Sequence, residues 1–338
     1  MSPNIETSYL GLKLKSPVIA GSSPLAETVD QAKRFEDAGV GAFVMHSLFE
    51  EQVVEEQRML HATTEWHDDT FGEATSFFPK FEEYRLVPDR YLEHLANLKR
   101  SLGVPVIASL NGRNSGPWLD FATQLESAGA DALELNVYHI AADPDETGDA
   151  VEARYLALLT ELKRTVAVPV VMKLPPFFAS LPNFVRRLEA GGAAGVSLFN
   201  RFFQPDINLD DLQMVDRLEL SSPDEALLRI RWIAILRAQT RMTLAATGGV
   251  YGADEALKLL LAGADVVHLA SALLEHGPGR LSQILHDMKG WMVEREYESL
   301  AQLKGSMCQT NLRDASMLAR QSYIRVLDSF TPRPGVWR

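Results

Sequence analysis

The chain has 338 residues, of which 46% are apolar, enough for a large core. Its single cysteine, Cys308, excludes an internal disulfide, a cysteine-ligated iron–sulfur cluster and a multi-cysteine zinc site. The formal net charge of −12 argues against nucleic acid as a partner, because phosphate binding needs a basic face. Apolar runs stay well short of the roughly 18 residues of a membrane span, and residues 1–15 lack the apolar core of a signal peptide, so we expect a cytoplasmic enzyme without a membrane partner.

The first predicted element is a β-hairpin within residues 5–15, where polar and apolar residues alternate around Leu10-Gly11. Eight short runs rich in Val, Ile, Leu and Ala follow, and they alternate with longer segments of helical spacing. The runs cover residues 17–23, 41–47, 104–112, 131–137, 168–176, 194–200, 242–249 and 264–271. Continuous apolar runs are typical of parallel strands that are covered on both faces. Eight such units favour a TIM (β/α)8 barrel, closed at its bottom by the hairpin, over an open doubly wound sheet.

We expect one domain over residues 1–338, with a polar helical tail from about residue 290. Three connections are too long to be plain linkers, and they cover residues 48–88, 138–150 and 201–223. All three leave the C-terminal ends of predicted strands, which form the active-site face of a TIM barrel. We therefore expect them to be lids and pocket walls around a small-molecule site.

The ends of the predicted strands supply the candidate site residues. In chain order these are Gly21, Ser22, His46, Ser47, Ser109, Asn111, Asn136, Lys173, Asn200, Thr247, Gly248, Gly249, Ala270 and Ser271. Lys173 closes an apolar strand and should point into the barrel mouth, where a full charge is unfavourable unless an anionic group meets it. The alternative is a lysine that extends along the surface into solvent.

Small-residue turns follow the seventh and eighth strands, at Gly248-Gly249 and at Ala270-Ser271. Both turns open onto predicted helices, and the exposed backbone N–H groups of such helix starts bind phosphate. A Gly-Gly pair by itself is usually only a turn. Two small-residue turns at the seventh and eighth strands of one barrel are more specific, and they predict a phosphate site.

An ordered set of motifs resembles the class 1 dihydroorotate dehydrogenases over about residues 5–304. The motifs are SPVIAGSS, ALELN, VMKLPPFF, ATGGV, GAD and SALLEHGPG. The resemblance implies an FMN-binding TIM barrel, usually a homodimer, that serves pyrimidine biosynthesis. It also implies an oxidoreductase that acts on a CH–CH group and transfers hydride between a small molecule and FMN.

The same resemblance assigns roles to the strand-end residues. It places Gly21 and Ser22 against the flavin, and Asn136 and Lys173 at the polar edge of the isoalloxazine ring. A lysine there stabilises the negative charge that two-electron reduction leaves on the flavin. It places Gly248, Gly249, Ala270 and Ser271 around the FMN phosphate. His46, Ser47, Asn111 and Asn200 complete the candidate cofactor site.

The sequence departs from the family at the catalytic base. The family has cysteine or serine there, whereas His139 occupies the matching position and Ala141 replaces a substrate asparagine. The stretch ATSFFPK, residues 74–80, lacks the asparagines of a family loop, and His46 replaces a family lysine. His139 is either a general base or a loop histidine bonded to a backbone carbonyl. We expect turnover of dihydroorotate to be weak or absent.

Three classes of function remain open. The first is an FMN-dependent oxidoreductase of this family, in which His139 and Lys173 are the catalytic candidates. The second is a catalytically deficient flavin-binding protein that serves as an electron-transfer or regulatory partner. The third is a barrel without redox chemistry, in which Lys173 forms a Schiff base or binds phosphate.

Overall fold

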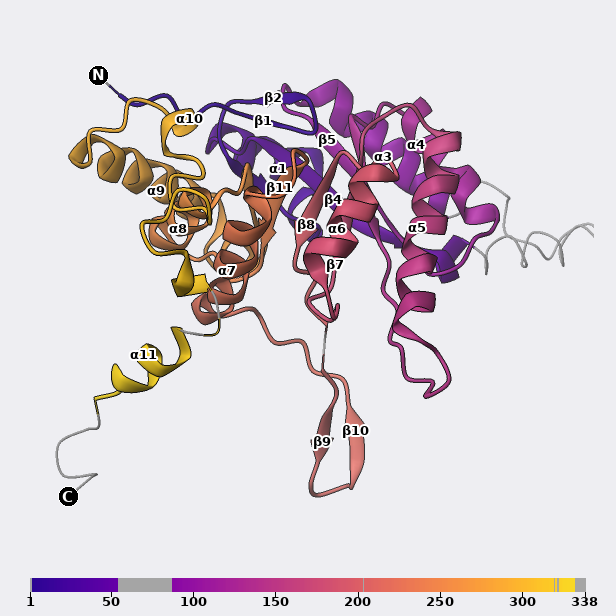
Figure 1. Ribbon diagram of the computed structural model, residues 1–338. Coiled ribbons are helices and arrows are strands. Elements are labelled where there is room, and N and C mark those ends of the chain that lie inside the picture. The colour runs from indigo at the N-terminus through magenta and orange to yellow at the C-terminus, as the bar shows by residue number, and fades with distance from the viewer. Residues whose placement is uncertain (1, 54–86, 203, 319, 321, 332–338) are drawn as a thin grey trace, which may run out of the picture.

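The computed structural model describes residues 2–53, 87–202, 204–318, 320 and 322–331, and Figure 1 shows their arrangement. Eight parallel strands form a closed barrel in the order β11-β12-β3-β4-β5-β6-β7-β8. The strands are β3 (Val18–Ala20), β4 (Ala42–Phe49), β5 (Val106–Asn111), β6 (Ala132–Asn136), β7 (Val170–Leu174), β8 (Gly195–Leu198), β11 (Thr243–Thr247) and β12 (Val266–Leu269). Each starts within one of the eight predicted runs, and only β4 continues past its run. The predicted TIM barrel is confirmed.

Helices connect successive strands around the barrel, and further helices follow the last strand, β12, in the C-terminal part of the chain (Figure 1). They are α1 (Val29–Asp37), α3 (Val87–Ser101), α4 (Asp120–Ser127), α5 (Gly148–Thr165), α6 (Leu181–Ala190), α7 (Ala226–Arg237), α8 (Ala253–Ala262), α9 (Ser271–Glu294), α10 (Leu300–Leu303) and α11 (Ser322–Asp328). In α5 the buried side chains recur at three- and four-residue spacing, which places one apolar stripe against the sheet. Thr147 caps the start of α5 by accepting a hydrogen bond from the backbone N–H of Ala150, at 3.2 Å.

The interior of the barrel has an apolar lower half. Strands β1 (Thr7–Tyr9) and β2 (Leu12–Leu14) form the predicted antiparallel hairpin, whose turn residues Leu10 and Gly11 both have positive φ. The hairpin side chains pack on inward-facing side chains near the N-terminal ends of the strands. This cluster contains Tyr9, Leu10, Leu14, Ile19, Ala42, Val44, Ile107, Ala132, Val171, Ala245 and Val266. The prediction of a hairpin that closes the barrel bottom is confirmed.

One of the three long connections forms a hairpin of its own. The segment 201–223 includes β9 (Asp206–Asn208) and β10 (Gln213–Val215), an antiparallel hairpin that projects away from the barrel (Figure 1). The segment 138–150 leads into α5. Residues 54–86, with the stretch ATSFFPK, lie outside the described residues. Within the described ranges, the helices are too short or too polar to cross a membrane.

Candidate active site

A cavity of about 600 Å³ lies at the C-terminal ends of the barrel strands. Eleven of the candidate cofactor-binding and catalytic residues line it. They are Ser22, His46, Ser47, Asn111, Asn136, Lys173, Asn200, Gly248, Gly249, Ala270 and Ser271. Gly21 and His139 are not among the lining residues; Gly21 instead donates its backbone N–H to the carbonyl oxygen of Leu269, at 2.9 Å. The parallel strands bring residues far apart in sequence together because all their C-terminal ends meet at one face.

Strand alternation selects which side chains face the cavity. In β6, Leu133 and Leu135 pack in the outer core beneath the helices, whereas Glu134 and Asn136 face the barrel interior. Asn136 pairs in register with Asn111 of β5 on one side and with Lys173 of β7 on the other. Three polar side chains therefore stand side by side at the same level of the barrel.

The buried asparagines at this level hold one another. Asn200, which follows β8, donates from Nδ2 to Oδ1 of Asn136, at 3.0 Å. The bond engages the carbonyl end of the Asn136 amide, so its N–H groups are the ones that a ligand can use. A flat ligand with carbonyl or ring-nitrogen acceptors along one edge matches this donor.

A row of hydroxyl groups lies on the neighbouring strands of the barrel. The register of β4 shifts between Val44 and Ser47, which places the Ser47 hydroxyl 2.8 Å from that of Ser109 and 3.3 Å from that of Ser22. His46 lines the cavity beside this row, and its ring lies edge-on to Tyr91, with 5.1 Å between the centroids. Desolvation by its neighbours lowers the pKa of His46, the charge of His94 lowers it further, and Glu27 raises it. His46 therefore offers the cavity a neutral hydrogen-bonding group rather than a charge.

The floor of the cavity contains a buried ion pair. Lys173 places its Nζ 3.3 Å from Oε1 of Glu134, whose side chain is fully buried. Among the residues that the structure describes, none forms a hydrogen bond with either carboxylate oxygen of Glu134. Nδ1 of His268 lies 3.9 Å from Oε2 of Glu134, and burial lowers the pKa of His268 to about 4, with Glu134 raising it and Lys173 lowering it. His268 is thus neutral at pH 7, and Glu134 is the anionic group that meets the Lys173 ammonium.

The far end of the cavity is built from glycines and hydroxyls. Gly248 and Gly249 have φ values of 92° and 80°, a region that favours glycine. A Cβ on Gly249 would also lie 2.5 Å from the backbone nitrogen of Ala226. The neighbouring Ser271, at the start of α9, accepts hydrogen bonds from the backbone N–H and the hydroxyl of Ser221. Backbone thus approaches the cavity closely at the predicted phosphate turns.

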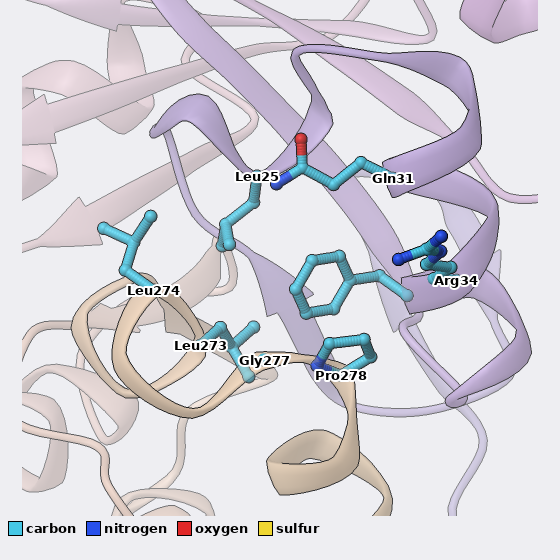
Figure 2. Close-up of a pocket in the computed structure, with 8 residues that line it drawn as sticks. Leu25, Gln31, Arg34, Leu273, Leu274, Gly277 and Pro278 are labelled. Atoms are coloured by element: carbon cyan, nitrogen blue, oxygen red, sulfur yellow. The ribbon is translucent and has the colours of Figure 1, made fainter.

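A second, smaller hollow lies outside the barrel, between α1 and α9 (Figure 2). Its volume is about 230 Å³, and Figure 2 shows Leu25, Leu273 and Pro278 around it, with Gln31 and Arg34 coming from α1. The described residues include no group of His, Cys, Asp or Glu side chains placed to hold a metal ion. None of the strand-end candidate residues lines this smaller hollow.

Comparison with known proteins agrees with this geometry. The family model of dihydroorotate dehydrogenase matches residues 87–292. The chain belongs to the dihydroorotate dehydrogenase family. This family member is 28% identical to a protein of Aeropyrum pernix that is assigned provisionally to dihydroorotate dehydrogenase A (fumarate), over 90% of this chain and 97% of the relative.

Two further relatives have NAD(+) or NADP(+) in their names. The catalytic subunit of dihydroorotate dehydrogenase B (NAD(+)) of Thermoplasma volcanium is 22% identical, over 89% of this chain and 98% of its own. The chloroplastic dihydropyrimidine dehydrogenase (NADP(+)) of Arabidopsis thaliana is 21% identical, over 94% of this chain and 80% of its own. This family member is accordingly an oxidoreductase.

In this dihydroorotate dehydrogenase family member, His139 is bonded within its own loop. Its Nε2 lies 2.7 Å from Oε2 of Glu146, and Nη2 of Arg154 donates to Oε1 of the same carboxylate, at 2.8 Å. The hydrogen bonds from His139 and then Arg154 hold the pKa of Glu146 below its usual range. His139 therefore bonds a carboxylate, whereas the alternative to a catalytic role was a loop histidine bonded to a backbone carbonyl. Its role as a base stays a prediction.

Sequence reasoning missed several residues of this site. One is Glu134, which lies in the motif ALELN two residues before Asn136, so that strand alternation places both on the same face. Tyr138 and Arg201 also line the cavity, and the Tyr138 ring packs on Phe202 with 4.4 Å between centroids. Period-two alternation could have found Glu134. Nothing local marks Tyr138 and Arg201, because loop geometry decides where their side chains point.

Proposed function

We propose that this protein binds FMN noncovalently in the 600 Å³ cavity and transfers hydride between a small molecule and the flavin. The observation that carries the proposal is the polar floor, where the Lys173 ammonium and the buried Asn136 amide stand side by side. The volume falls in the range of small-molecule and cofactor sites. Bound FMN would supply the hydride acceptor, and the chain supplies binding, orientation and charge.

The residues present fit the flavin ring and the phosphate of FMN. Lys173 and Asn136 offer a positive charge and amide donors to the polar edge of the flavin ring, with Asn111 and Asn200 beside them. The positive-φ turn at Gly248-Gly249 admits a phosphate against the backbone, where a side chain would not fit. Ser22, Ser47, His46, Ala270 and Ser271 complete the proposed set of cofactor contacts, with Gly21 supporting the loop behind them.

The visible spectrum tests this proposal. The purified protein should be yellow, or should become so when FMN is added and free flavin is removed. A colourless protein that takes up no FMN would contradict the proposal, and it would also return Lys173 to the alternative of a barrel without redox chemistry.

We propose further that dihydroorotate is a poor substrate. The loop 138–150 contains neither cysteine nor serine, and the histidine at the base position is paired with Glu146 rather than exposed in the cavity. Loss of a positioned base lowers a rate by about 10²–10⁴-fold. Ala141 also lacks the amide of a substrate asparagine, and polar substrate atoms left unpaired lose binding free energy. The aromatic lining at Tyr138 and Phe199 instead favours a more apolar substrate.

Dihydroorotate oxidation by the FMN-loaded protein, with a range of acceptors, is the decisive assay. Turnover at ordinary enzymatic rates, roughly 1–10³ s⁻¹, would contradict the proposal. If His139 is the base for another substrate, activity on that substrate should rise with pH through a histidine-like titration and disappear in His139→Ala.

The position of His139 also supports the second candidate function, a flavin-binding protein that exchanges electrons without pyrimidine chemistry. Photoreduction of the bound FMN, followed by trial oxidants and dihydropyrimidines, separates the two. Reoxidation by acceptors alone, with no dihydropyrimidine able to reduce the flavin, would favour electron transfer.

At the family level we propose a cytoplasmic, single-domain homodimer related to pyrimidine biosynthesis. Exposed apolar side chains on the projecting β9-β10 segment support self-association, since Leu209 and Leu212 are each 81% exposed. Light scattering of the purified protein tests the dimer, and a monomeric mass at micromolar concentration would contradict it.

A further inference from the structure

Arg229 of α7 lies behind the Gly248-Gly249 turn and is almost completely buried. Its Nε donates to the carbonyl oxygen of Thr247, at 2.9 Å, and its Nη1 donates to that of Glu225, at 2.7 Å. Its Nη2 donates to the carbonyl oxygen of Phe199, at 3.5 Å. These carbonyls belong to the end of β11, to η4 (Pro223–Glu225) and to the residue after β8. One guanidinium therefore joins three segments that meet at the end of the cavity.

The guanidinium also packs directly on the turn. A Cβ added to Gly248 would lie 2.8 Å from Nη2 and 3.3 Å from Cζ of Arg229. Gly248 and Gly249 line the cavity, whereas Arg229 does not. The backbone of the glycine turn therefore separates the Arg229 charge from a ligand in the cavity.

Arg229 shares its carboxylate partner with a second arginine. Glu225 is shared by two guanidinium groups, with Oε2 3.5 Å from Nη2 of Arg229 and Oε1 3.1 Å from Nε of Arg201. Among the described residues, Glu225 is the one carboxylate within ion-pair distance of Arg229. Burial lowers the pKa of Arg229, Glu225 raises it and Arg201 lowers it, but arginine keeps its charge at neutral pH. Arg229 therefore has only a shared carboxylate to balance its charge in a poorly solvated place, which favours an anionic ligand nearby.

The three hydrogen bonds have a second effect on an anion. The carbonyl oxygens of Thr247 and Phe199 lie next to residues that line the cavity, and unbonded carbonyls there would repel a phosphate. Arg229 binds both oxygens from behind. The groups that the turn then presents to a ligand are its backbone N–H groups, which are the phosphate-binding groups of such turns.

We propose that Arg229 is the positioning residue that makes the site select a phosphorylated flavin over an unphosphorylated one. This inference rests on the proposed binding of FMN. Arg229 holds the Gly248-Gly249 turn in its phosphate-binding form and supplies the positive charge behind it. Its removal should weaken binding of FMN and leave binding of riboflavin, which lacks the phosphate, almost unchanged.

Fluorescence titration of the full-length apoprotein with FMN and with riboflavin tests the inference. The wild type should bind FMN more tightly than riboflavin. In Arg229→Met, the FMN dissociation constant should rise tenfold or more, which is about 1.4 kcal/mol. The riboflavin constant should change less than about twofold, because riboflavin has no phosphate for the charge and the turn to hold. Arg229→Lys keeps the positive charge but cannot bond all three carbonyl oxygens, so its FMN dissociation constant should lie between those of the wild type and Arg229→Met.

Arg237→Met is the matched control, because Arg237 lies at the other end of α7 and is also largely buried. It pairs with Asp265 and donates to the carbonyl oxygen of Met242, away from the cavity. Both flavin affinities should stay at their wild-type values in this variant. A riboflavin loss equal to the FMN loss in Arg229→Met would show that Arg229 merely supports the fold, and would overturn the inference.

Gly248→Ala alters the contact between the turn and Arg229 from the side of the turn. It tests the inference if Arg229→Met does not fold. The added Cβ must displace the guanidinium, so FMN selectivity should fall, and in combination with Arg229→Lys the losses should be less than additive. Unchanged selectivity in Gly248→Ala and Arg229→Lys would overturn the role of Arg229. A wild type that binds both flavins equally would overturn it as well while leaving flavin binding intact, and a wild type that binds neither would remove the proposed function itself.

Discussion

Two buried carboxylates, Asp265 and Glu134, lie at opposite levels of the barrel and are satisfied very differently. Asp265 stands at the foot of β12, where Oδ2 accepts from the backbone N–H of Leu244, at 2.7 Å, and Oδ1 accepts from Nζ of Lys304, at 2.6 Å. Arg237 adds a second cation 3.5 Å away. Glu134 has no hydrogen-bond partner among the described residues, and its counterion, Lys173, also lines the cavity.

The contrast separates a structural carboxylate from one that serves a site. Buried polar groups are almost always hydrogen-bonded, so each exception calls for a reason. At the barrel foot, Lys304 and Arg237 line neither of the two cavities described above, and they stabilise the fold. At the cavity floor, Lys173 lies between a carboxylate below and the proposed flavin above, so Glu134 shares its counterion with the ligand. We infer that, of the two carboxylates, Asp265 contributes more to the stability of the fold. The Glu134–Lys173 pair instead sets the charge beside the proposed flavin.

The largest expected effect is on stability, in Asp265→Asn. Loss of the charge leaves two cations without their carboxylate, and the free energy of unfolding should fall by about 3–5 kcal/mol, as for other broken buried pairs. Urea denaturation measures it. Asp131 is the matched control, because it bonds Lys99 and the backbone N–H of Val106 in the same way at the foot of β6 but is about one quarter exposed. Asp131→Asn should lose only about 1 kcal/mol, and equal losses in the two variants would contradict the role of burial.

The next effect is on the flavin, in Lys173→Met. Removing the cation from the polar edge should destabilise the anionic reduced flavin by a few kcal/mol at an effective dielectric constant near 20. The two-electron reduction potential should therefore fall by on the order of 50–100 mV, since 30 mV corresponds to about 1.4 kcal/mol. Potentiometric titration of the FMN-loaded protein measures this, and an unchanged potential would remove Lys173 from the flavin edge.

The third effect is on pH dependence, through His268 beside Glu134. Its pKa is about 4 in the folded protein, against 6.5 ordinarily, so the unfolded chain takes up a proton first as the pH falls. The stability that this histidine contributes is fully present above pH 6.5 and is lost as the pH falls toward 4, by roughly 3 kcal/mol at most. Urea denaturation across this window should show a shallower loss in His268→Gln than in the wild type. Parallel curves for the two proteins would show that His268 does not titrate as the structure indicates.

The smallest effect should come from Glu134→Gln. The substitution keeps the side-chain shape and breaks no hydrogen bond, and Lys173 can still reach the cavity, so stability should change by about 1 kcal/mol or less. The reduction potential should rise, opposite in sign to Lys173→Met, because a negative charge beside the lysine is gone. A stability loss as large as that of Asp265→Asn would break the distinction between the two carboxylates.

The sequence by itself determined the barrel and most of the cavity wall. The eight apolar runs and the Leu10-Gly11 hairpin are local signals, and parallel pairing then brings every strand end to one face. For this reason Asn111, Asn136 and Lys173 could be assigned to one site without a structure. The three-residue pattern Gly-Ala-Asp at 129–131 and 263–265 likewise marks two helix-to-strand junctions, each with its aspartate at the foot of a strand.

Only the tertiary structure decided how the charged groups are paired. Glu134 meets Lys173 from the next strand, and Arg229 reaches backward from α7 to carbonyls on two other elements. The partner of His139 is a glutamate of its own loop, but nothing in the spacing distinguishes that bond from one to a backbone carbonyl. Pattern and propensity set which face a residue occupies, because they act through backbone geometry within a few residues. The choice of partner depends on where side chains from distant segments meet, and in this protein it is this choice that separates the structural charges from those that serve the cavity.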